Sequence, residues 1–477
     1  MPALSQSQVV GVIGAGTMGA GIAQVAAAAG HRVRLYDGFA GAARAGKGRI
    51  SSGLDSQVER GRMARGEADA LLERIVVTEA LADLADAGLV IEAIIEDLDA
   101  KRRLLAQLEA IVSPQAILAT NTSSISVTAI ASPCRHPDRI VGAHFFNPAP
   151  VMKLVEVVSG VTTAPAVAEI VFDTVAAWGK TAVHARSTPG FVVNRVARPF
   201  YAEALRLLEE QVANPQTLDA LLVQSGGFRM GPFELMDLIG NDVNYAVTVS
   251  IFNAFYNDPR FRPSIAQLEL INAGRLGRKT GRGFYEYGDQ SVKMPPDSEP
   301  ALTEELPLSG FVVGRAVSID GVHIALTDGR TAADRSASVG QPVILVDLTA
   351  PPGKFTRVGY TASADVTPTF QGQFVATLQG QGLAVTRLPD WPGLVVMRTV
   401  AMLANEAFEA CMQGVAHEAG IDAAMRNGVN YPQGPAEWAR LIGLTHVLAV
   451  LDNIHDQTLD PRYRASMALR SAAKRSS

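Results

Sequence analysis

Residues 9–37 read VVGVIGAGTMGAGIAQVAAAAGHRVRLYD, and the order of residue types in this stretch predicts a complete structural unit. The apolar run at 9–13 is typical of a buried strand, and an alanine-rich helix is expected to follow the glycine turn GAGTMG. A second strand is expected to end at Asp37. Strand, turn, helix, strand and terminal acid in this order predict a dinucleotide-binding βαβ unit, whereas the glycine motif alone would be weak evidence.

The residues of the glycine turn have separate predicted roles. Gly14 permits the tight turn, Gly16 lets the backbone approach a pyrophosphate, and Gly19 allows the helix to pack closely on the strand. Thr17 and Met18 complete the turn at the N-terminus of the helix, which is expected to face the phosphates.

Asp37 is predicted to hold the ribose hydroxyls of an adenosine. Its carboxylate would repel a 2′-phosphate, which favours NAD over NADP as the cofactor, although Arg32 and Arg34 keep NADP open. Residues 9–30 carry no charge and have the length of a membrane span, but their glycines and their division into strand and helix argue against one. No membrane association is therefore expected.

Length, charge and cysteine content narrow the class of protein. A chain of 477 residues is expected to contain about two to four domains. A net charge of −5 and a pI near 6.0 argue against a nucleic-acid-binding protein, because no positive field would attract a phosphate backbone. Cys134 and Cys411 have no disulfide or metal-ligand spacing, so no metal site is expected. The first residues show no secretory pattern, so the expected location is the cytoplasm.

A second informative stretch, residues 120–158, places polar side chains in apolar or turn settings. His144 stands between small residues and two phenylalanines, Glu156 interrupts a strand-like run, and a hydroxyl-rich turn with Ser123 lies upstream. A lone histidine there is more often a half-buried packing residue, and a lone strand glutamate usually faces solvent. A glutamate that holds one imidazole nitrogen would instead leave the other nitrogen free to act as a general base.

Three motifs of this stretch resemble the 3-hydroxyacyl-CoA dehydrogenases in their order and spacing. They are NTSS at 121–124, HFFNP at 144–148 and LVEVV at 154–158. The resemblance implies an α/β Rossmann-type NAD-binding domain, followed by all-α domains that are similar to the C-terminal domain of 6-phosphogluconate dehydrogenase.

The same resemblance implies a set of catalytic residues. His144 would take the proton of a 3-hydroxyl group, and Glu156 would orient His144 and balance its charge. Ser123 and Asn194 would hold the 3-oxygen as it becomes a carbonyl. Without the resemblance, the Asn194 amide could equally bind a neighbouring helix.

Four further residues are placed near NAD by the resemblance: Glu96, Lys101, Asn147 and Lys279. Glu96 and Lys101 follow a strand-like run, and ligands bind beyond the carboxyl ends of the strands in open parallel sheets. For Lys101, a surface charge is an equal alternative. Lys279 lies in the glycine-rich basic turn that closes the first helical segment.

Residues 41–66 are predicted to be helical and are unusually basic for an acidic chain. The resemblance implies that this segment supplies cations for the phosphates of coenzyme A, whereas a solvated helical face is the alternative. The basic residues are Arg44, Lys47, Arg49, Arg60, Arg62 and Arg65.

The C-terminal part of the chain repeats an earlier part. The motif PGFVVNR at 189–195 matches PGLVVMR at 392–398, a distance of 203 residues (392 − 189), and Glu203 matches Glu406 at the same distance. Met397 replaces Asn194, and a thioether cannot donate a hydrogen bond. The second copy is therefore predicted to be structural and to pack against the first as a dimer partner would.

Between the two copies, a linker and a decayed α/β domain are expected, with strands at 311–313, 343–347 and 383–386. One continuous helix is expected from Gly190 through Leu208. The predicted domains are 1–187 for NAD binding, 188–288 for the first helical copy, 289–388 for the linker and α/β remnant, and 389–477 for the second helical copy.

These observations together predict the NAD-dependent oxidation of a (3S)-3-hydroxyacyl-CoA. The duplicated helical domain, in a chain without hydratase sequence, resembles the bacterial dehydrogenases of phenylacetate breakdown, which implies 3-hydroxyadipyl-CoA as the substrate. A 3-hydroxybutyryl-CoA dehydrogenase of fatty-acid metabolism and a noncatalytic NAD-binding relative are the alternatives. A distal carboxylate on the substrate would need a basic partner, for which Arg195, Arg198 and Arg229 are candidates. The chain is expected to be a monomer or a homodimer.

Overall fold

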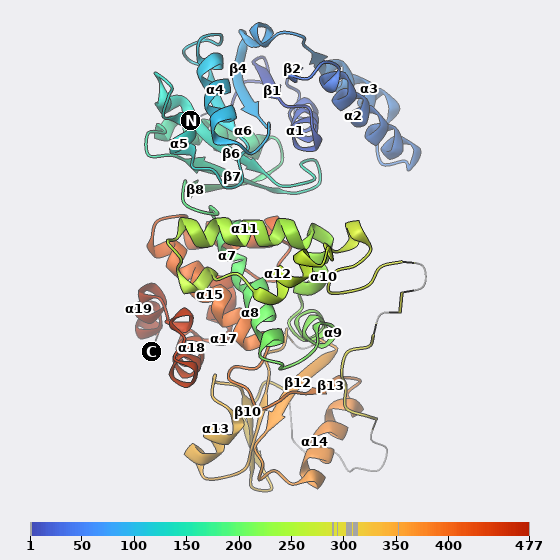
Figure 1. Cartoon of the computed structure of the whole chain (residues 1–477), viewed down its shortest axis with the longest axis vertical. Coiled ribbons are helices and arrows are strands. Elements are labelled where there is room, and N and C mark those ends of the chain that lie inside the picture. Colours follow the sequence, from blue (N-terminus) through green and yellow to red (C-terminus); the bar gives the residue numbers. More distant parts are fainter. Residues whose placement is uncertain are drawn as a thin grey trace. The chain divides into compact units, whose positions relative to one another are not determined.

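The computed structural model describes residues 2–288, 291–292, 294–301, 308, 313–351 and 353–476. The chain forms two compact units (Figure 1). Among the residues so described, no helix combines the length and the apolar character needed to cross a membrane. Unit 1 comprises Met1–Val193 and Gln413–Val429, and unit 2 comprises Asn194–Met412 and Asn430–Ser477. The four domain boundaries expected from the sequence stay a prediction.

The described part of unit 1 contains an eight-stranded sheet in the order β3-β2-β1-β4-β5-β6-β7-β8. Neighbouring strands are parallel except for β6 and β7. The order reverses direction at β1, and this switch point is where dinucleotides bind in doubly wound folds, so the predicted Rossmann-type fold is confirmed. The strands are β1 (Val9–Ile13), β2 (Val33–Tyr36), β3 (Ile75–Val77), β4 (Ala87–Glu92), β5 (Ile117–Thr120), β6 (Ile140–Phe145), β7 (Leu154–Ser159) and β8 (Thr181–Arg186).

Helices cover the sheet, which explains why the central strands are buried along almost their whole length and are mostly apolar, rather than apolar at alternate positions. Four helices share one core with the strands, namely α1 (Thr17–Ala28), α2 (Ala42–Glu59), α3 (Arg65–Arg74) and α6 (Pro165–Ala177). Helices α4 (Leu98–Glu109) and α5 (Val127–Ala131) pack on one another. Helix α16 (Glu418–Gly428), from the second helical copy, packs on β7 and β8.

The continuous helix predicted from Gly190 through Leu208 is wrong. The structure has a turn followed by two helices, α7 (Val193–Val196) and α8 (Arg198–Glu209), with Pro199 in the first turn of α8. Proline has no N–H group for an intrahelical bond and its ring clashes with the preceding turn, so the helix is interrupted just before it. The second copy has Met402 at the matching position, and its helix α15 (Val396–Met412) is unbroken.

Unit 2 contains most of both helical copies. The first copy continues with α9 (Pro215–Ala220), the π-helical turn η3 (Leu221–Ser225), α10 (Pro232–Ile239), α11 (Asn241–Ala254) and α12 (Ile265–Asn272). The second copy continues after α15 with α17 (Pro435–Ile442), α18 (Leu444–Thr458) and α19 (Met467–Ser476).

Two buried ion pairs join the helical copies reciprocally. Arg195 Nε donates to Glu406 Oε1 at 2.6 Å, and Arg398 Nε donates to Glu203 Oε2 at 2.8 Å. Because Arg195 matches Arg398 and Glu203 matches Glu406 in the repeat, each pair is the image of the other. Such exchange of partners is the signature of a two-fold interface, here formed within one chain.

A second, five-stranded sheet in the order β13-β12-β11-β10-β9 lies between the copies in the described sequence. The strands expected near 343–347 and 383–386 are present as β11 and β13, whereas residues 311–312 of the third lie outside the described residues. Three strands escaped prediction because they are short or interrupted by polar residues. The elements are β9 (Val317–Ile319), β10 (Val322–Leu326), α13 (Ala332–Val339), β11 (Val343–Val346), β12 (Arg357–Ala362), α14 (Pro368–Gly380) and β13 (Ala384–Arg387).

Candidate active site

The glycine turn between β1 and α1 has the tight geometry that its sequence predicted. Gly14 has φ of +89°, a conformation that strains other residues. A Cβ at Gly19 would lie 1.7 Å from the Gly14 carbonyl oxygen, so this contact between helix and strand requires glycine. A Cβ at Gly16 would meet no atom of the described residues within 4 Å. The backbone at Gly16 is therefore open to a ligand that approaches from outside.

The N-terminus of α1 suits the phosphates of a dinucleotide. Gly16 is its N-cap residue and supplies no side-chain hydrogen bond, and both Gly16 and Thr17 are exposed, with Met18 half-buried. The first backbone N–H groups of a helix have no intrahelical partner and lie at the positive end of the helix dipole. Together with the open face at Gly16, they fit a pyrophosphate.

Asp37 is held beside this turn at the end of β2. Its Oδ2 accepts a hydrogen bond from Ala15 N at 2.7 Å, and its Oδ1 accepts one from Phe39 N at 2.9 Å. These bonds fix the carboxylate next to the glycine turn, where a ribose attached to the pyrophosphate would lie in this class of fold.

His144 and Glu156 are joined across the antiparallel strands β6 and β7, where they are direct partners in the register. His144 Nδ1 and Glu156 Oε2 lie 2.6 Å apart, and both residues are buried. The rings of Phe146 and Phe191 pack around the imidazole, at centroid distances of 4.4 and 5.9 Å. A carboxylate that accepts from Nδ1–H leaves Nε2 as the nitrogen that can accept a proton. The solvent-facing glutamate considered from the sequence is therefore wrong.

The second carboxylate oxygen of Glu156 is hydrogen-bonded to the backbone rather than to His144. Its Oε1 accepts hydrogen bonds from Val192 N at 3.1 Å and Val193 N at 2.9 Å. Both oxygens of this fully buried carboxylate are therefore bonded, and its orientation toward His144 is fixed by the backbone that leads into α7. The sequence motif did not reveal this bond because the donors lie more than thirty positions away.

The second copy retains this backbone anchor but not the histidine. Asp347, at the end of β11, accepts from Val395 N at 3.1 Å, Val396 N at 2.8 Å and Met397 N at 2.9 Å. Val395 and Val396 match Val192 and Val193 in the repeat. Burial raises the pKa of Asp347 to about 6 against the opposing effect of its backbone donors. The carboxylate of the first copy thus bonds both a histidine and the backbone, whereas that of the second copy bonds the backbone.

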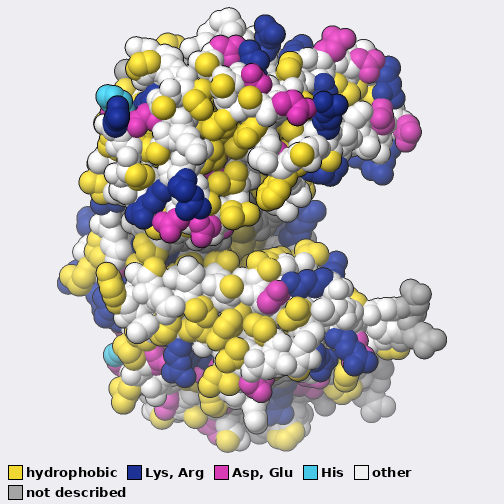
Figure 2. Space-filling model, turned by 45° about the horizontal axis from the view of Figure 1, so that its top comes forward, with side chains coloured by type: hydrophobic (Ala, Val, Ile, Leu, Met, Phe, Trp, Pro, Cys, Tyr) yellow, Lys and Arg dark blue, Asp and Glu magenta, His cyan; other side chains and the backbone are white. Residues whose placement is uncertain are grey.

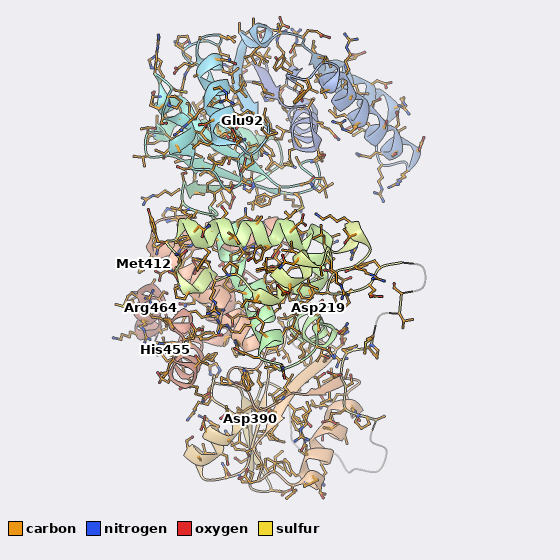
Figure 3. All side chains as sticks on the ribbon, in the orientation of Figure 1. Glu92, Asp219, Asp390, Met412, His455 and Arg464 are labelled. Atoms are coloured by element: carbon orange, nitrogen blue, oxygen red, sulfur yellow. The ribbon has the colours of Figure 1, made fainter. Side chains whose placement is uncertain are left out.

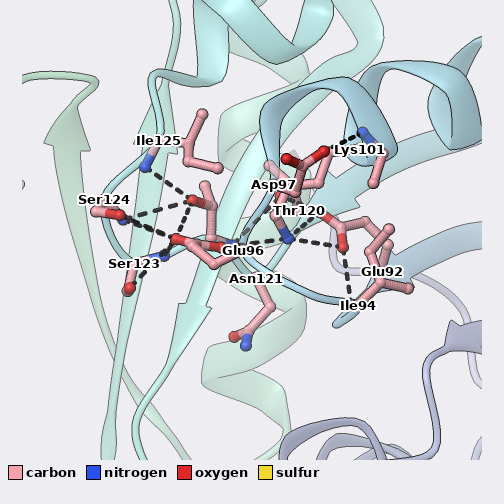
Figure 4. A network of polar contacts seen from close by, with 12 residues as sticks. Glu92, Ile94, Glu96, Asp97, Lys101, Thr120, Asn121, Ser123, Ser124 and Ile125 are labelled. Atoms are coloured by element: carbon pink, nitrogen blue, oxygen red, sulfur yellow. Dashed lines mark hydrogen bonds and ion pairs between the residues drawn. The ribbon is translucent and has the colours of Figure 1, made fainter. Parts of the chain in front are cut away.

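A second polar network surrounds the turn that carries Ser123 (Figure 4). One oxygen of Glu96, Oε1, accepts from Thr122 Oγ1 at 2.7 Å, from Ser123 N and Oγ at 2.9 and 3.3 Å, and from Ser124 N and Oγ at 3.1 Å each. Burial alone would raise the pKa of Glu96, but the bond from Thr122, the charge of Lys101 and the serine donors outweigh it, so its pKa is lowered. Glu96 is therefore an ionised carboxylate that accepts hydrogen bonds from three consecutive residues of this turn.

Lys101 supports Glu96 from inside the protein. Its side chain is only 1% exposed, so the surface-charge alternative is wrong. Its Nζ lies 3.0 Å from both oxygens of Glu92 and 3.4 Å from Glu96 Oε2. Glu92, labelled in Figure 3, also accepts from Thr120 Oγ1. Glu92 was missed from the sequence, although an acid at the end of an apolar strand was the available signal. Direct contact of Glu96 or Lys101 with NAD stays a prediction.

We expect Glu96→Ala to lower kcat/KM about 10- to 100-fold, because the hydroxyl of Ser123 would lose a charged acceptor. Asp99→Ala is the matched control, since Asp99 is an exposed acid three residues after Glu96, in the first turn of α4, and lies 3.6 Å from Arg102. Steady-state assays with unchanged circular dichroism would test this. Equal activity of the two variants would contradict a positioning role for Glu96.

The other predicted site residues have less enclosed settings. Asn147 is exposed just beyond the end of β6. Nearby, Asn121 Oδ1 accepts a hydrogen bond from Phe145 N at 2.8 Å, and this bond joins the turn that carries Ser123 to the end of β6. Asn194 is half-buried and is the first residue of unit 2. Lys279, also in unit 2, lies 2.6 Å from Asp242, and its hydrogen bond lowers the pKa of that carboxyl. The roles of Asn147, Asn194 and Lys279 stay predictions.

The basic segment forms α2 and the start of α3, and most of its cations have partners. Arg44 pairs with Glu79, Arg65 with Asp55, and Lys47 and Arg49 donate to backbone carbonyls. Figure 2 shows lysine and arginine side chains interspersed with acidic ones on the visible face. Among the described residues, Arg60 and Arg62 are the two cations of the segment that are exposed and without a bonded partner. They are the best placed of the six for an external phosphate.

Comparison with known families matches three parts of the chain. The model "3-hydroxyacyl-CoA dehydrogenase, NAD binding domain" matches residues 9–188. The model "3-hydroxyacyl-CoA dehydrogenase, C-terminal domain" matches 190–287 and again 393–476, which confirms the internal duplication. Residues 324–392 match the "3-hydroxybutyryl-CoA dehydrogenase reduced Rossmann-fold domain", in agreement with the decayed α/β domain expected there.

The similar proteins differ in how much of this chain they match. The chain is 46% identical over 472 residues to the 3-hydroxyadipyl-CoA dehydrogenase of Escherichia coli K12, covering 98% of this chain and 97% of that protein. A crystal structure described as 3-hydroxybutyryl-CoA dehydrogenase from E. coli K12 has a TM-score of 0.94 at 45% identity, covering 99% of each chain. The probable 3-hydroxybutyryl-CoA dehydrogenase of Bacillus subtilis is 40% identical but covers 59% of this chain, with 97% of its own length matched.

Proposed function

Because this chain belongs to the 3-hydroxyacyl-CoA dehydrogenase family, we propose that it oxidises the 3-hydroxyl of 3-hydroxyadipyl-CoA to the 3-oxo group, with NAD as its cofactor. The observation that carries the choice of substrate is the identity of 46% with a 3-hydroxyadipyl-CoA dehydrogenase along almost the whole of both chains. 3-Hydroxybutyryl-CoA is the second candidate, because a structure that matches equally completely carries that substrate in its description.

His144 is proposed to accept the proton that the substrate loses in this reaction. Nε2 of the imidazole takes the proton of the 3-hydroxyl, and the carboxylate of Glu156, 2.6 Å from Nδ1, stabilises the imidazolium that forms. The antiparallel register keeps the two side chains on the same face of the sheet, so this geometry exists before substrate binds. Phe146 and Phe191 restrict the imidazole to that orientation and limit its contact with water.

Two side chains are proposed to donate hydrogen bonds to the 3-oxygen of the substrate. The hydroxyl of Ser123 donates to Glu96 Oε1 at 3.3 Å in the structure, and it would turn from Glu96 to donate to the 3-oxygen when the substrate binds. Asn194, which opens the first helical copy, is proposed as the second donor; its replacement by Met397 in the other copy supports this assignment, because the anchor at Asp347 is retained there while the amide is lost.

The cofactor is proposed to bind at the glycine turn. When bound, NAD supplies the acceptor for the hydride that leaves C3 of the substrate. The backbone from Gly14 to Gly19 and the N-terminus of α1 would hold its pyrophosphate, and Asp37 would hold its adenosine ribose.

The substrate is tested by NADH formation with 3-hydroxyadipyl-CoA and 3-hydroxybutyryl-CoA at several concentrations. We expect kcat/KM to favour the dicarboxylyl thioester by about tenfold or more, because a basic side chain would form a charged hydrogen bond with the distal carboxylate. A preference for 3-hydroxybutyryl-CoA would replace the proposed substrate and keep the reaction. Absence of turnover with both, together with tight NAD binding, would support a noncatalytic relative.

A further inference from the structure

A small cavity of about 190 Å³ lies within unit 2, beside helix α8 of the first helical copy. Basic side chains dominate the charge of its lining, and Thr248 and Ser264 add hydroxyl groups. The charged lining residues are Arg198, Arg206, Arg262, Arg462, Glu209 and Glu210.

Arg198 is the unusual member of this set. It is 5% exposed, and none of the described carboxylates forms an ion pair with it. Its Nη1 donates to Thr248 Oγ1 at 3.2 Å, its guanidinium lies 4.8 Å from the centre of the Tyr201 ring, and its Nε has no hydrogen-bond partner among the residues that the structure describes. An arginine remains charged in proteins, so this is a buried positive charge without an anion.

The two glutamates of the lining are hydrogen-bonded to groups other than Arg198. Glu209 Oε1 accepts from Ser264 Oγ at 2.7 Å and from Ala266 N at 3.2 Å. Glu210 accepts from Trp391 Nε1 at 2.8 Å and from Arg398 at 2.9 Å.

Burial lowers the pKa of Arg198, and only neighbouring tyrosines oppose that effect. A buried charge in this condition is costly unless an anion compensates it.

The repeat shows that the helical fold does not require this arginine. Arg195 and Glu203 match Arg398 and Glu406, which fixes the alignment of the two helices at 203 residues. On that alignment Arg198 corresponds to Ala401, and Tyr201 corresponds to Ala404, both buried in the second copy. The first copy therefore carries a buried cation and an aromatic ring where the same packing tolerates alanine.

We propose that the cavity beside Arg198 binds a carboxylate or a similar small oxyanion. The anion has two possible sources with the same chemistry, namely the distal carboxylate of a dicarboxylyl-CoA substrate or a free oxyanion in solution. The first source rests on the proposed function, whereas the second is independent of it. Of the three cations considered for a distal carboxylate, Arg195 is already paired with Glu406 and Arg229 is exposed, which leaves Arg198 as the buried one.

The first arm of the test uses inorganic sulfate as the probe and thermal unfolding of the full chain as the readout. The midpoint of the wild type is expected to rise by a few degrees with sodium sulfate, saturably and beyond the effect of sodium chloride at equal ionic strength. Arg198→Met should abolish that rise, and Arg198→Lys should retain part of it. Arg470→Ala is the matched control, since it removes a half-exposed arginine, paired with Asp452, from the same unit.

Removal of Arg198 is also expected to leave the protein at least as stable without sulfate, because no buried carboxylate loses a partner. Arg198→Ala, which copies the residue of the second copy, provides an independent variant if Arg198→Met folds poorly.

The second arm compares kcat/KM for 3-hydroxyadipyl-CoA and 3-hydroxybutyryl-CoA in the same variants. A loss of preference for the dicarboxylyl substrate by about 10- to 100-fold in Arg198→Met, but not in Arg470→Ala, would identify the substrate carboxylate as the anion. Loss of the sulfate effect with an unchanged substrate ratio would identify a free oxyanion, even if the wild type prefers the short substrate. If Arg198→Met changes neither the sulfate effect nor the substrate ratio, the proposal is overturned.

Discussion

His144→Ala is expected to lower kcat by about 10²- to 10⁴-fold, the usual contribution of a general base, while NAD still binds. The imidazole is the group that Glu156 orients, and an alanine leaves no acceptor for the proton of the 3-hydroxyl. The cofactor is expected at the glycine turn and Asp37, which the substitution does not touch. Turnover is followed by NADH absorbance, and NAD affinity by titration calorimetry.

The control for this variant is His136→Ala, which removes an exposed histidine from the same unit. It should retain activity. If His144→Ala kept kcat within a factor of a few of the wild type, the proton would have to leave through another group and the proposed role of the His144–Glu156 pair would be wrong. Loss of NAD affinity together with activity would indicate a structural effect instead.

Arg398→Ala is expected to destabilise unit 2 by about 3–5 kcal/mol, the usual consequence of removing one partner of a buried ion pair. Arg398 and Glu203 are both 1% exposed, so the substitution leaves a buried carboxylate without its main cation. Arg462 Nη1 remains 3.9 Å from Glu203 Oε1, and the hydroxyl of Tyr463 still donates to Oε2, which favours the lower part of that range.

The comparison is with the half-exposed pair of Arg470 and Asp452, whose side chains are 38% and 36% exposed and whose removal should change stability by about 0–1 kcal/mol. Urea unfolding followed by fluorescence and circular dichroism measures both. The double variant Arg398→Met/Glu203→Leu should recover most of the lost stability, because apolar side chains can replace a buried ion pair. Equal effects of Arg398→Ala and Arg470→Ala would show that the buried pair does not hold the two helical copies together.

Much of the first unit could be predicted from local sequence patterns. The glycine turn, the apolar strands around it and Asp37 lie within thirty residues, and their spacing alone specifies a dinucleotide-binding unit. The motifs around Ser123, His144 and Glu156 predicted the pairing of His144 with Glu156, and the repeat in the sequence identified the second helical copy. Such features are encoded by neighbours in sequence or by matching letters.

The tertiary structure decided the features that depend on distant partners. The burial of Lys101 follows from Glu92 on another element, the reciprocal pairs follow from residues about two hundred positions apart, and the isolation of Arg198 follows from what packs around it. Pattern and spacing report which face of an element is apolar, but the energy of a buried charge depends on which groups the fold brings within a few ångströms. The sequence by itself therefore determined the family and the fold class and predicted the principal site, while only the packed chain decided which buried charges are paired and which are not.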